Sequence, residues 1–100
     1  MAPTTHKLDW DPVKNAVNLR KHKIDFKSAK RFNWPYAHIE TDGREDYGEL
    51  RERATGFIGD VLHVLIFTER DDVTWIISLR TANKGERKDC VKATSHQRDR

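Results

Sequence analysis

Arg80 is the side chain of this sequence best placed to do chemistry. It follows the largely apolar run 73–79, and no acidic residue lies within five positions of it. An arginine that ends a strand holds its guanidinium at the rim of a sheet, where the planar fork can bind a phosphate through two hydrogen bonds. We therefore expect Arg80 to bind an anionic group such as a phosphodiester.

Three further arginines could extend this anion-binding surface. Arg51 and Arg53 fall on one face of a predicted strand, because successive side chains of a strand point to opposite sides. Arg70 lies in the turn before the strand that ends at Arg80. Arg51 and Arg80 could then bracket a phosphodiester. The sequence leaves open a second interpretation, in which Arg51 and Arg53 pair with the many carboxylates nearby.

Cap signals predict two helices near the N-terminus. Asp11 is followed by a proline, which is typical of a helix start, and the apolar spacing that follows predicts a helix ending at Lys21 or His22. Asp25 can cap a second, shorter helix that ends before Pro35.

From Tyr36 onward the apolar period becomes that of strands. Four strands are predicted, over 36–41, 49–58, 61–68 and 73–80. Asp42-Gly43 marks the turn after the first strand, and the third strand, which is apolar on both faces, should be central. Alternation in the fourth strand predicts that one face carries Thr74, Ile76, Ser78 and Arg80.

A last helix is predicted over about 84–95. Asn83 with Glu86 three positions later resembles a capping box, in which each residue caps the other's backbone N–H. The predicted fold is a single domain over residues 1–100 of the α+β class, with two N-terminal helices, a four-stranded antiparallel β-sheet and a C-terminal helix.

Composition limits the classes of function. Residues 12–32 carry seven Lys or Arg against one Asp, which can attract a polyanion such as RNA or can simply be a solvated helix face. No run approaches the ~20 apolar residues of a membrane span, and the N-terminus lacks a signal-like apolar core, so we expect a cytoplasmic protein. The single cysteine, Cys90, rules out an internal disulfide and a cysteine-rich zinc site. The five histidines show no metal-ligand spacing, so no metal or cofactor is expected.

Five segments together resemble the BrnT toxins of bacterial type II toxin–antitoxin systems, which are small RelE-like ribonucleases. In consistent order and spacing over roughly residues 8–90, the segments are Leu8-Asp9-Trp10-Asp11-Pro12, Asn18-Leu19-Arg20-Lys21-His22, Asp46-Tyr47-Gly48-Glu49 with Arg51, Phe67-Thr68-Glu69-Arg70 and residues 73–86. The resemblance implies cleavage of mRNA, inhibition of translation and neutralisation by a BrnA-like antitoxin. It implies contact with DNA only indirectly, through the toxin–antitoxin complex.

The resemblance also implies site residues, all of which keep the family's residue type here. They are Lys21, His22, Glu49, Arg51 and Arg80. We expect Arg53 and Arg70 to contribute to RNA binding. The chain departs from the family pattern at Lys23, which is usually glycine, at Trp34, which is usually acidic, and at Cys90, which is usually tyrosine.

Cleavage of RNA without a metal requires a base for the ribose 2′-OH, cations for the developing charge and an acid for the leaving 5′-oxygen. His22 titrates in the right range for acid or base, although it could instead bond a free carbonyl near the end of its helix. Glu49 could be the base if its surroundings raise its pKa. Two alternatives to a ribonuclease stay open, a non-catalytic RNA- or DNA-binding module and a protein that serves only to bind an antitoxin.

Overall fold

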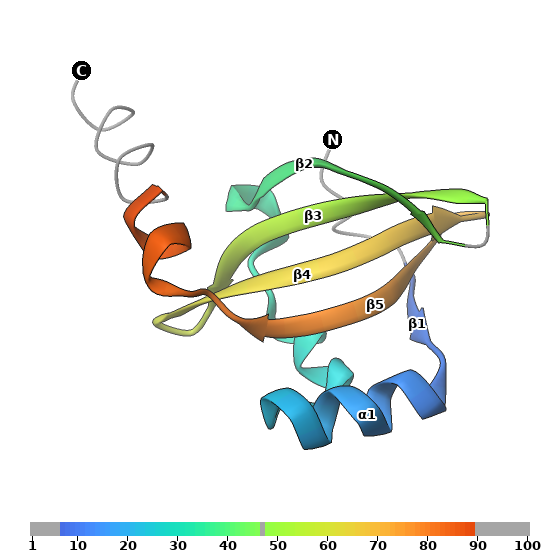
Figure 1. Ribbon diagram of the computed structural model, residues 1–100, viewed down its shortest axis with the longest axis horizontal. Coiled ribbons are helices and arrows are strands. Elements are labelled where there is room, and N and C mark those ends of the chain that lie inside the picture. Colours follow the sequence, from blue (N-terminus) through green and yellow to red (C-terminus); the bar gives the residue numbers. More distant parts are fainter. Residues whose placement is uncertain (1–6, 47, 90–100) are drawn as a thin grey trace.

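A five-stranded sheet forms the centre of the computed structural model, which describes residues 7–46 and 48–89 (Figure 1). The strands are β1 (Lys7–Trp10), β2 (His38–Asp46), β3 (Glu49–Ile58), β4 (Val61–Arg70) and β5 (Val73–Thr81). Their spatial order is β1-β5-β4-β3-β2. Strands β2 to β5 form the predicted antiparallel meander with β4 in the middle, whereas β1 pairs with β5 in parallel.

The prediction of four antiparallel strands was therefore wrong in two details. It missed β1, because this strand has only four residues and its partner lies more than sixty positions away in the chain. The predicted turn at Asp42-Gly43 is also wrong. The strand continues to Asp46 through a register shift between Thr41 and Glu45, with Gly43 at φ 84.

The first helix, α1 (Pro12–His22), has the predicted start and end. The Asp11 carboxylate accepts a hydrogen bond of 2.9 Å from the N–H of Val13. Lys23 ends the helix in the left-handed conformation at φ 63, and its N–H donates to the carbonyl of Leu19. A lysine in this conformation costs on the order of 1 kcal/mol relative to glycine.

The predicted second helix is wrong in type. Asp25 caps it as expected, but the segment is a 3₁₀ helix, η1 (Phe26–Arg31), followed by a second one, η2 (Trp34–Tyr36). Phe32 ends η1 because it forms a β-bridge with Ile58, which leaves only six residues for the helix. Short segments of this kind commonly adopt 3₁₀ geometry.

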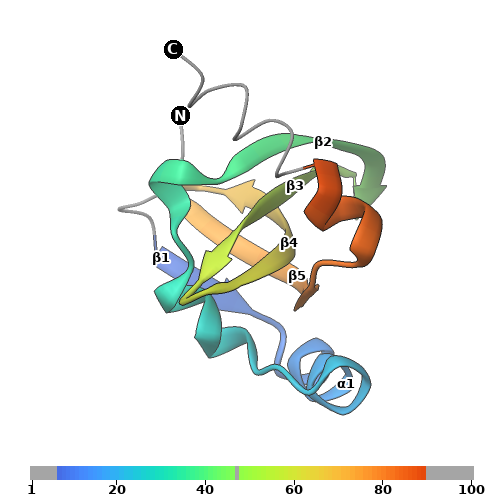
Figure 2. The same ribbon diagram turned by 90° about the vertical axis from the view of Figure 1, so that its left-hand side faces the viewer.

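The main core lies between the sheet and these helical segments, which Figure 2 shows on the opposite side of the sheet from the helical residues 84–89. Ala29 and Phe32 are buried in this core, and Trp34 packs edge to face against both Phe32 and Phe67. A smaller cluster on the other side of the sheet joins Ala82 to the apolar side chains of β4, which are Leu62, Val64 and Ile66.

A β-bulge in β5 overturns the predicted alternation of that strand. Ile76 pairs with Phe67 and Ser78 pairs with Ile66, so Ile77 is an extra residue. Thr74 and Ile76 are buried on the core side, and after the bulge it is Leu79 that returns to this side. Without the extra residue, Arg80 would follow Ile76 into the core. The bulge therefore turns Arg80 out to the other side, a common use of such irregularities.

Candidate active site

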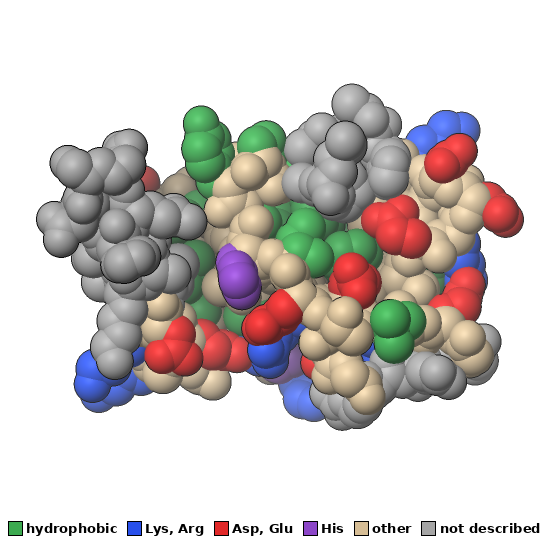
Figure 3. Space-filling view, turned by 90° about the horizontal axis from the view of Figure 1, so that it is seen from above, with side chains coloured by type: hydrophobic (Ala, Val, Ile, Leu, Met, Phe, Trp, Pro, Cys, Tyr) green, Lys and Arg blue, Asp and Glu red, His purple; other side chains and the backbone are tan. Residues whose placement is uncertain are grey.

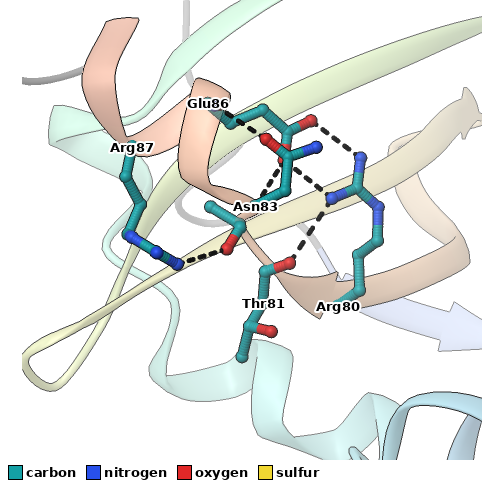
Figure 4. A network of polar contacts seen from close by, with 6 residues as sticks. Arg80, Thr81, Asn83, Glu86 and Arg87 are labelled. Atoms are coloured by element: carbon teal, nitrogen blue, oxygen red, sulfur yellow. Dashed lines mark hydrogen bonds and ion pairs between the residues drawn. The ribbon is translucent and has the colours of Figure 1, made fainter.

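Arg80 pairs with the carboxylate of Glu86, which lies six positions later in the sequence and so outside the five positions that contain no acid (Figure 4). Its Nη1 donates to Oε1 of Glu86 at 2.7 Å, and its Nη2 donates to Oε2 at 2.8 Å. A longer bond of 3.4 Å runs from Nη1 to the carbonyl of Thr81. The end of the guanidinium is thus occupied by a two-oxygen anion, in the geometry that a phosphate would also use.

Glu86 also belongs to the predicted capping box, which is confirmed. Its Oε1 accepts from the N–H of Asn83, and Asn83 Oδ1 accepts from the N–H of Glu86, both at 2.8 Å. The hydrogen bonds from Arg80 lower the pKa of Glu86 from 4.5 to about 2, with smaller contributions from Asn83 and from the charge of Arg53. Glu86 in turn raises the pKa of Arg80. One carboxylate therefore joins the start of the last helix to the end of β5.

Arg53 lies on the same side of the sheet as Arg80. It bonds to Glu40 on the edge strand β2 and lowers the pKa of that carboxyl. Figure 3 shows acidic side chains beside basic ones on the side of the molecule that carries β2. Since the charge of Arg53 also reaches Glu86, Arg53 and Arg80 form one electrostatic group.

His22 joins this group from the end of α1. Burial lowers the pKa of His22 below 6.5, and the positive charges of Lys21 and then Arg80 lower it further. The imidazole is therefore mostly neutral at pH 7, which is the form that accepts a proton. Within residues 7–46 and 48–89, the ring of His22 makes no hydrogen bond. The alternative interpretation, in which His22 bonds a free carbonyl near the end of its helix, therefore does not hold in this conformation.

A second group lies farther along the sheet. Arg70 Nε donates to Glu49 Oε1 at 2.6 Å, and its guanidinium sits 4.8 Å from the ring centroid of Trp75. Arg51 forms a 3.7 Å ion pair with Asp42, and its Nε is buried without a hydrogen bond to any described residue.

The structure thus divides the predicted site residues into two groups. Lys21, His22 and Arg80 lie at one end of the sheet, Arg53 lies in the middle of β3, and Glu49, Arg51 and Arg70 lie toward the other end. Thr55 of β3 is level with Arg80 across β4. At 3.3 Å per residue, Glu49 is about 20 Å along β3 from that level. Glu49 therefore lies well along the sheet from the level of Arg80.

All four arginines of this surface have a carboxylate partner. We call the set Arg51, Arg53, Arg70 and Arg80 the arginine face, and their partners are respectively Asp42, Glu40, Glu49 and Glu86. The interpretation that Arg51 and Arg53 pair with nearby acids is confirmed. The capping signal at Asn83 already pointed to Glu86, but nothing local linked that carboxylate to Arg80.

Neither a metal centre nor a membrane span is built from the described residues. Among residues 7–46 and 48–89, no three His, Cys, Asp or Glu side chains converge as metal ligands do. In the same part of the chain, no helix has both the length and the apolar character needed to cross a bilayer. Cys90 lies outside the described residues.

Comparison with protein-family models identifies the family of this chain. The family model described as "Ribonuclease toxin, BrnT, of type II toxin-antitoxin system" matches residues 10–86, which include every residue of the arginine face and the Lys21-His22 pair. A search of curated proteins finds no match.

Proposed function

Because this chain belongs to the BrnT family of ribonuclease toxins of type II toxin–antitoxin systems, we propose that it cleaves mRNA without a metal ion. In this reaction the ribose 2′-OH attacks the adjacent phosphodiester, and the 5′-oxygen leaves. The observation that carries the proposal is the docking of α1 beside the end of β5: Asn18, one turn before His22, hydrogen-bonds to Leu79, the residue before Arg80. The charge of Arg80 also contributes to lowering the pKa of His22.

His22 is the proposed general base. A lowered pKa keeps its imidazole neutral at pH 7, so it can take the proton of the 2′-OH. The attack then forms the O2′–P bond and breaks the P–O5′ bond, leaving a 2′,3′-cyclic phosphate, and the departing 5′-oxygen takes a proton from water to become a hydroxyl. Lys21, exposed on the same helical turn, adds positive charge beside the developing phosphorane.

Arg80 is the proposed phosphate-binding residue, and it can act without leaving Glu86. A guanidinium has five N–H donors. The N–H of Nε and one N–H of Nη2 point in the same direction, so together they can bind a second anion through two hydrogen bonds. Glu86 and Thr81 occupy the other donors, and no described residue accepts from Nε of Arg80. Glu86 would then fix the guanidinium while its free edge stabilises the transition state.

The second group is proposed to bind RNA on either side of the cleaved bond. An RNA strand lying along β3 would pass from Arg80 over Arg53 to Arg51 and Arg70. In this scheme Glu49 positions Arg70 rather than acting as the base, because of its separation of about 20 Å from the level of Arg80. We further propose that the toxin acts in the cytoplasm and that a BrnA-like antitoxin neutralises it.

The test is cleavage of single-stranded RNA in EDTA by protein freed of antitoxin. We expect 2′,3′-cyclic phosphate or 3′-phosphate ends, and a loss of about a hundredfold in kcat/KM for Arg80→Ala. Lys7→Ala is the matched control, because Lys7 is exposed in β1, away from the arginine face, and its removal changes the net charge equally. Cleavage that needs added divalent metal would refute the metal-free mechanism.

A second candidate, a non-catalytic RNA- or DNA-binding module, is favoured by the pairing of every arginine of the arginine face with an acid. A protein of that kind would bind RNA with a salt-dependent affinity and leave it intact. Retained binding without cleavage at micromolar protein would select this alternative.

A further inference from the structure

The apolar stripe of α1 faces solvent. Val13 is 70% exposed and Val17 is 53% exposed, and Ala16 between them is exposed as well, whereas Asn18 on the opposite side of the helix is only 5% exposed. A helix on the surface of a globular domain normally places its apolar stripe on the core. The helix α1 has the reverse orientation, with its apolar stripe in solvent and polar Asn18 against the sheet.

Hydrogen bonds to asparagine side chains account for this reversal. Asn18 Nδ2 donates to the carbonyls of Leu79 at 2.8 Å and Ile24 at 3.0 Å, and its Oδ1 accepts from the N–H of Leu79 at 3.2 Å. Since β1 pairs with β5 only as far as Ile76, Asn18 takes the place of a neighbouring strand at Leu79. Asn15 similarly accepts from the N–H of Phe26 at 2.9 Å. These amides fix which side of α1 meets the sheet.

The outer face of α1, by which we mean Val13, Ala16, Val17 and Arg20, has the spacing of a helix-docking surface. Its residues follow the i, i+3, i+4, i+7 pattern through which one helix contacts another. Figure 1 shows α1 at the periphery of the molecule, on the far side of β5 from β4. Burial of two valines and an alanine would stabilise a complex, in opposition to the cost of ordering the partner.

Charge identifies the kind of partner. Neither α1 nor η1 contains an acidic residue, and their exposed cations are Arg20, Lys21, Lys27, Lys30 and Arg31. A second copy of this chain docked by a two-fold axis would bring Arg20 against its own equivalent, which disfavours a homodimer through this face. The valines offer nothing to a phosphate backbone, which disfavours RNA. An acidic amphipathic helix fits both the apolar and the cationic features.

We propose that the outer face of α1 binds an amphipathic helix of the antitoxin, with an apolar stripe against the valines and Asp or Glu opposite Arg20. The identity of the partner rests on the proposed function; the location of its binding surface is the new inference. Because α1 ends at Lys21 and His22, a helix lying along it would end beside the proposed base. Neutralisation would then come from exclusion of RNA, with the arginine face itself left in place.

The test compares Val17→Glu with Val61→Glu, two valines of similar exposure at 53% and 51% on different elements. Each variant is purified with the protein encoded beside this chain's own gene, and the dissociation constant and RNA cleavage are measured. We expect Val17→Glu to weaken the complex by about a hundredfold, as at a binding hot spot, and to restore growth inhibition in co-expression. Both variants should keep the cleavage rate of the parent at saturating RNA, where RNA association does not limit the rate. Glutamate favours a helix more than valine does, so Val17→Glu should fold.

The possible failures differ from one another. Equal affinity of the Val17→Glu and Val61→Glu variants for the antitoxin, with cleavage intact, overturns the docking surface and leaves the ribonuclease assignment standing. A parent protein that neither cleaves RNA nor binds the neighbouring gene product overturns both proposals. Restored binding when Arg20→Glu is combined with an acid-to-lysine change in the partner would identify the facing residue.

Discussion

Replacement of Glu86 by glutamine tests whether one carboxylate joins the last helix to β5. Glutamine keeps the shape of the side chain and can still cap Asn83, so Glu86→Gln removes chiefly the charge that Arg80 binds. The fall in the pKa of Glu86 from 4.5 to about 2 corresponds to about 3 kcal/mol of stability. Both side chains are partly exposed, at 23% and 31%, and water screening reduces this to about 1–2 kcal/mol.

The sign of the pH dependence follows from the direction of the shift. Because folding lowers the pKa of Glu86, its contribution is fully present above pH 4.5 and is lost as the pH falls toward 2. Asp25 and Glu40 also have lowered pKa values, so the parent and the variant should both lose stability in acid. Only the difference between the two proteins reports on Glu86.

Urea denaturation of the parent and Glu86→Gln at pH 7 and at pH 2.5 measures that difference. We expect the variant to be less stable by about 1–2 kcal/mol at pH 7 and the gap to close largely at pH 2.5. A gap of the same size at both pH values would show that the loss comes from shape rather than charge. No gap at pH 7 would refute the argument that Arg80 and Glu86 form a stabilising pair.

Three further perturbations test other parts of the structure. Arg80→Ala should move the acidic limb of the pH–rate profile to higher pH, because Arg80 helps to lower the pKa of His22. A limb at the same pH in parent and variant would show that the charge of Arg80 does not act on His22. Asn18→Ala should cost about 2–4 kcal/mol in urea denaturation, because it leaves the buried N–H and C=O of Leu79 without partners; a loss under 1 kcal/mol would contradict this. Lys23→Gly should raise stability by about 0.5–1 kcal/mol, since φ at this position is 63, and any decrease would argue against strain there.

The features predicted correctly from sequence are those set by neighbouring residues. The cap at Asp11, the end of the first helix at His22 and the reciprocal cap between Asn83 and Glu86 each depend on residues close in the sequence. Hairpin turns and apolar periodicity likewise placed β3, β4 and β5 to within two residues. These signals are local, so a single sequence contains them.

The features missed depend on contacts between distant segments. The pairing of β1 with β5 and the bonds from Asn18 to Leu79 join residues more than sixty positions apart. The bulge at Ile77 leaves no compositional mark, yet it decides that Arg80 faces outward. The roles assigned to His22 and Arg80 stay predictions, but their proximity is a result of the fold that spacing alone did not reveal.

The pairing of each arginine with its own acid has a consequence for the order of events in RNA binding. Each arginine–carboxylate pair on the arginine face has no net charge and therefore attracts a distant anion only weakly. By contrast, α1 and η1 carry exposed cations and no acid. Since encounter rates depend on the net field and bound-state lifetimes on close contacts, RNA should meet α1 and η1 first. Added salt should then slow association more than it speeds dissociation. An antitoxin helix on α1 would cover the cations that RNA meets first and would also block the site.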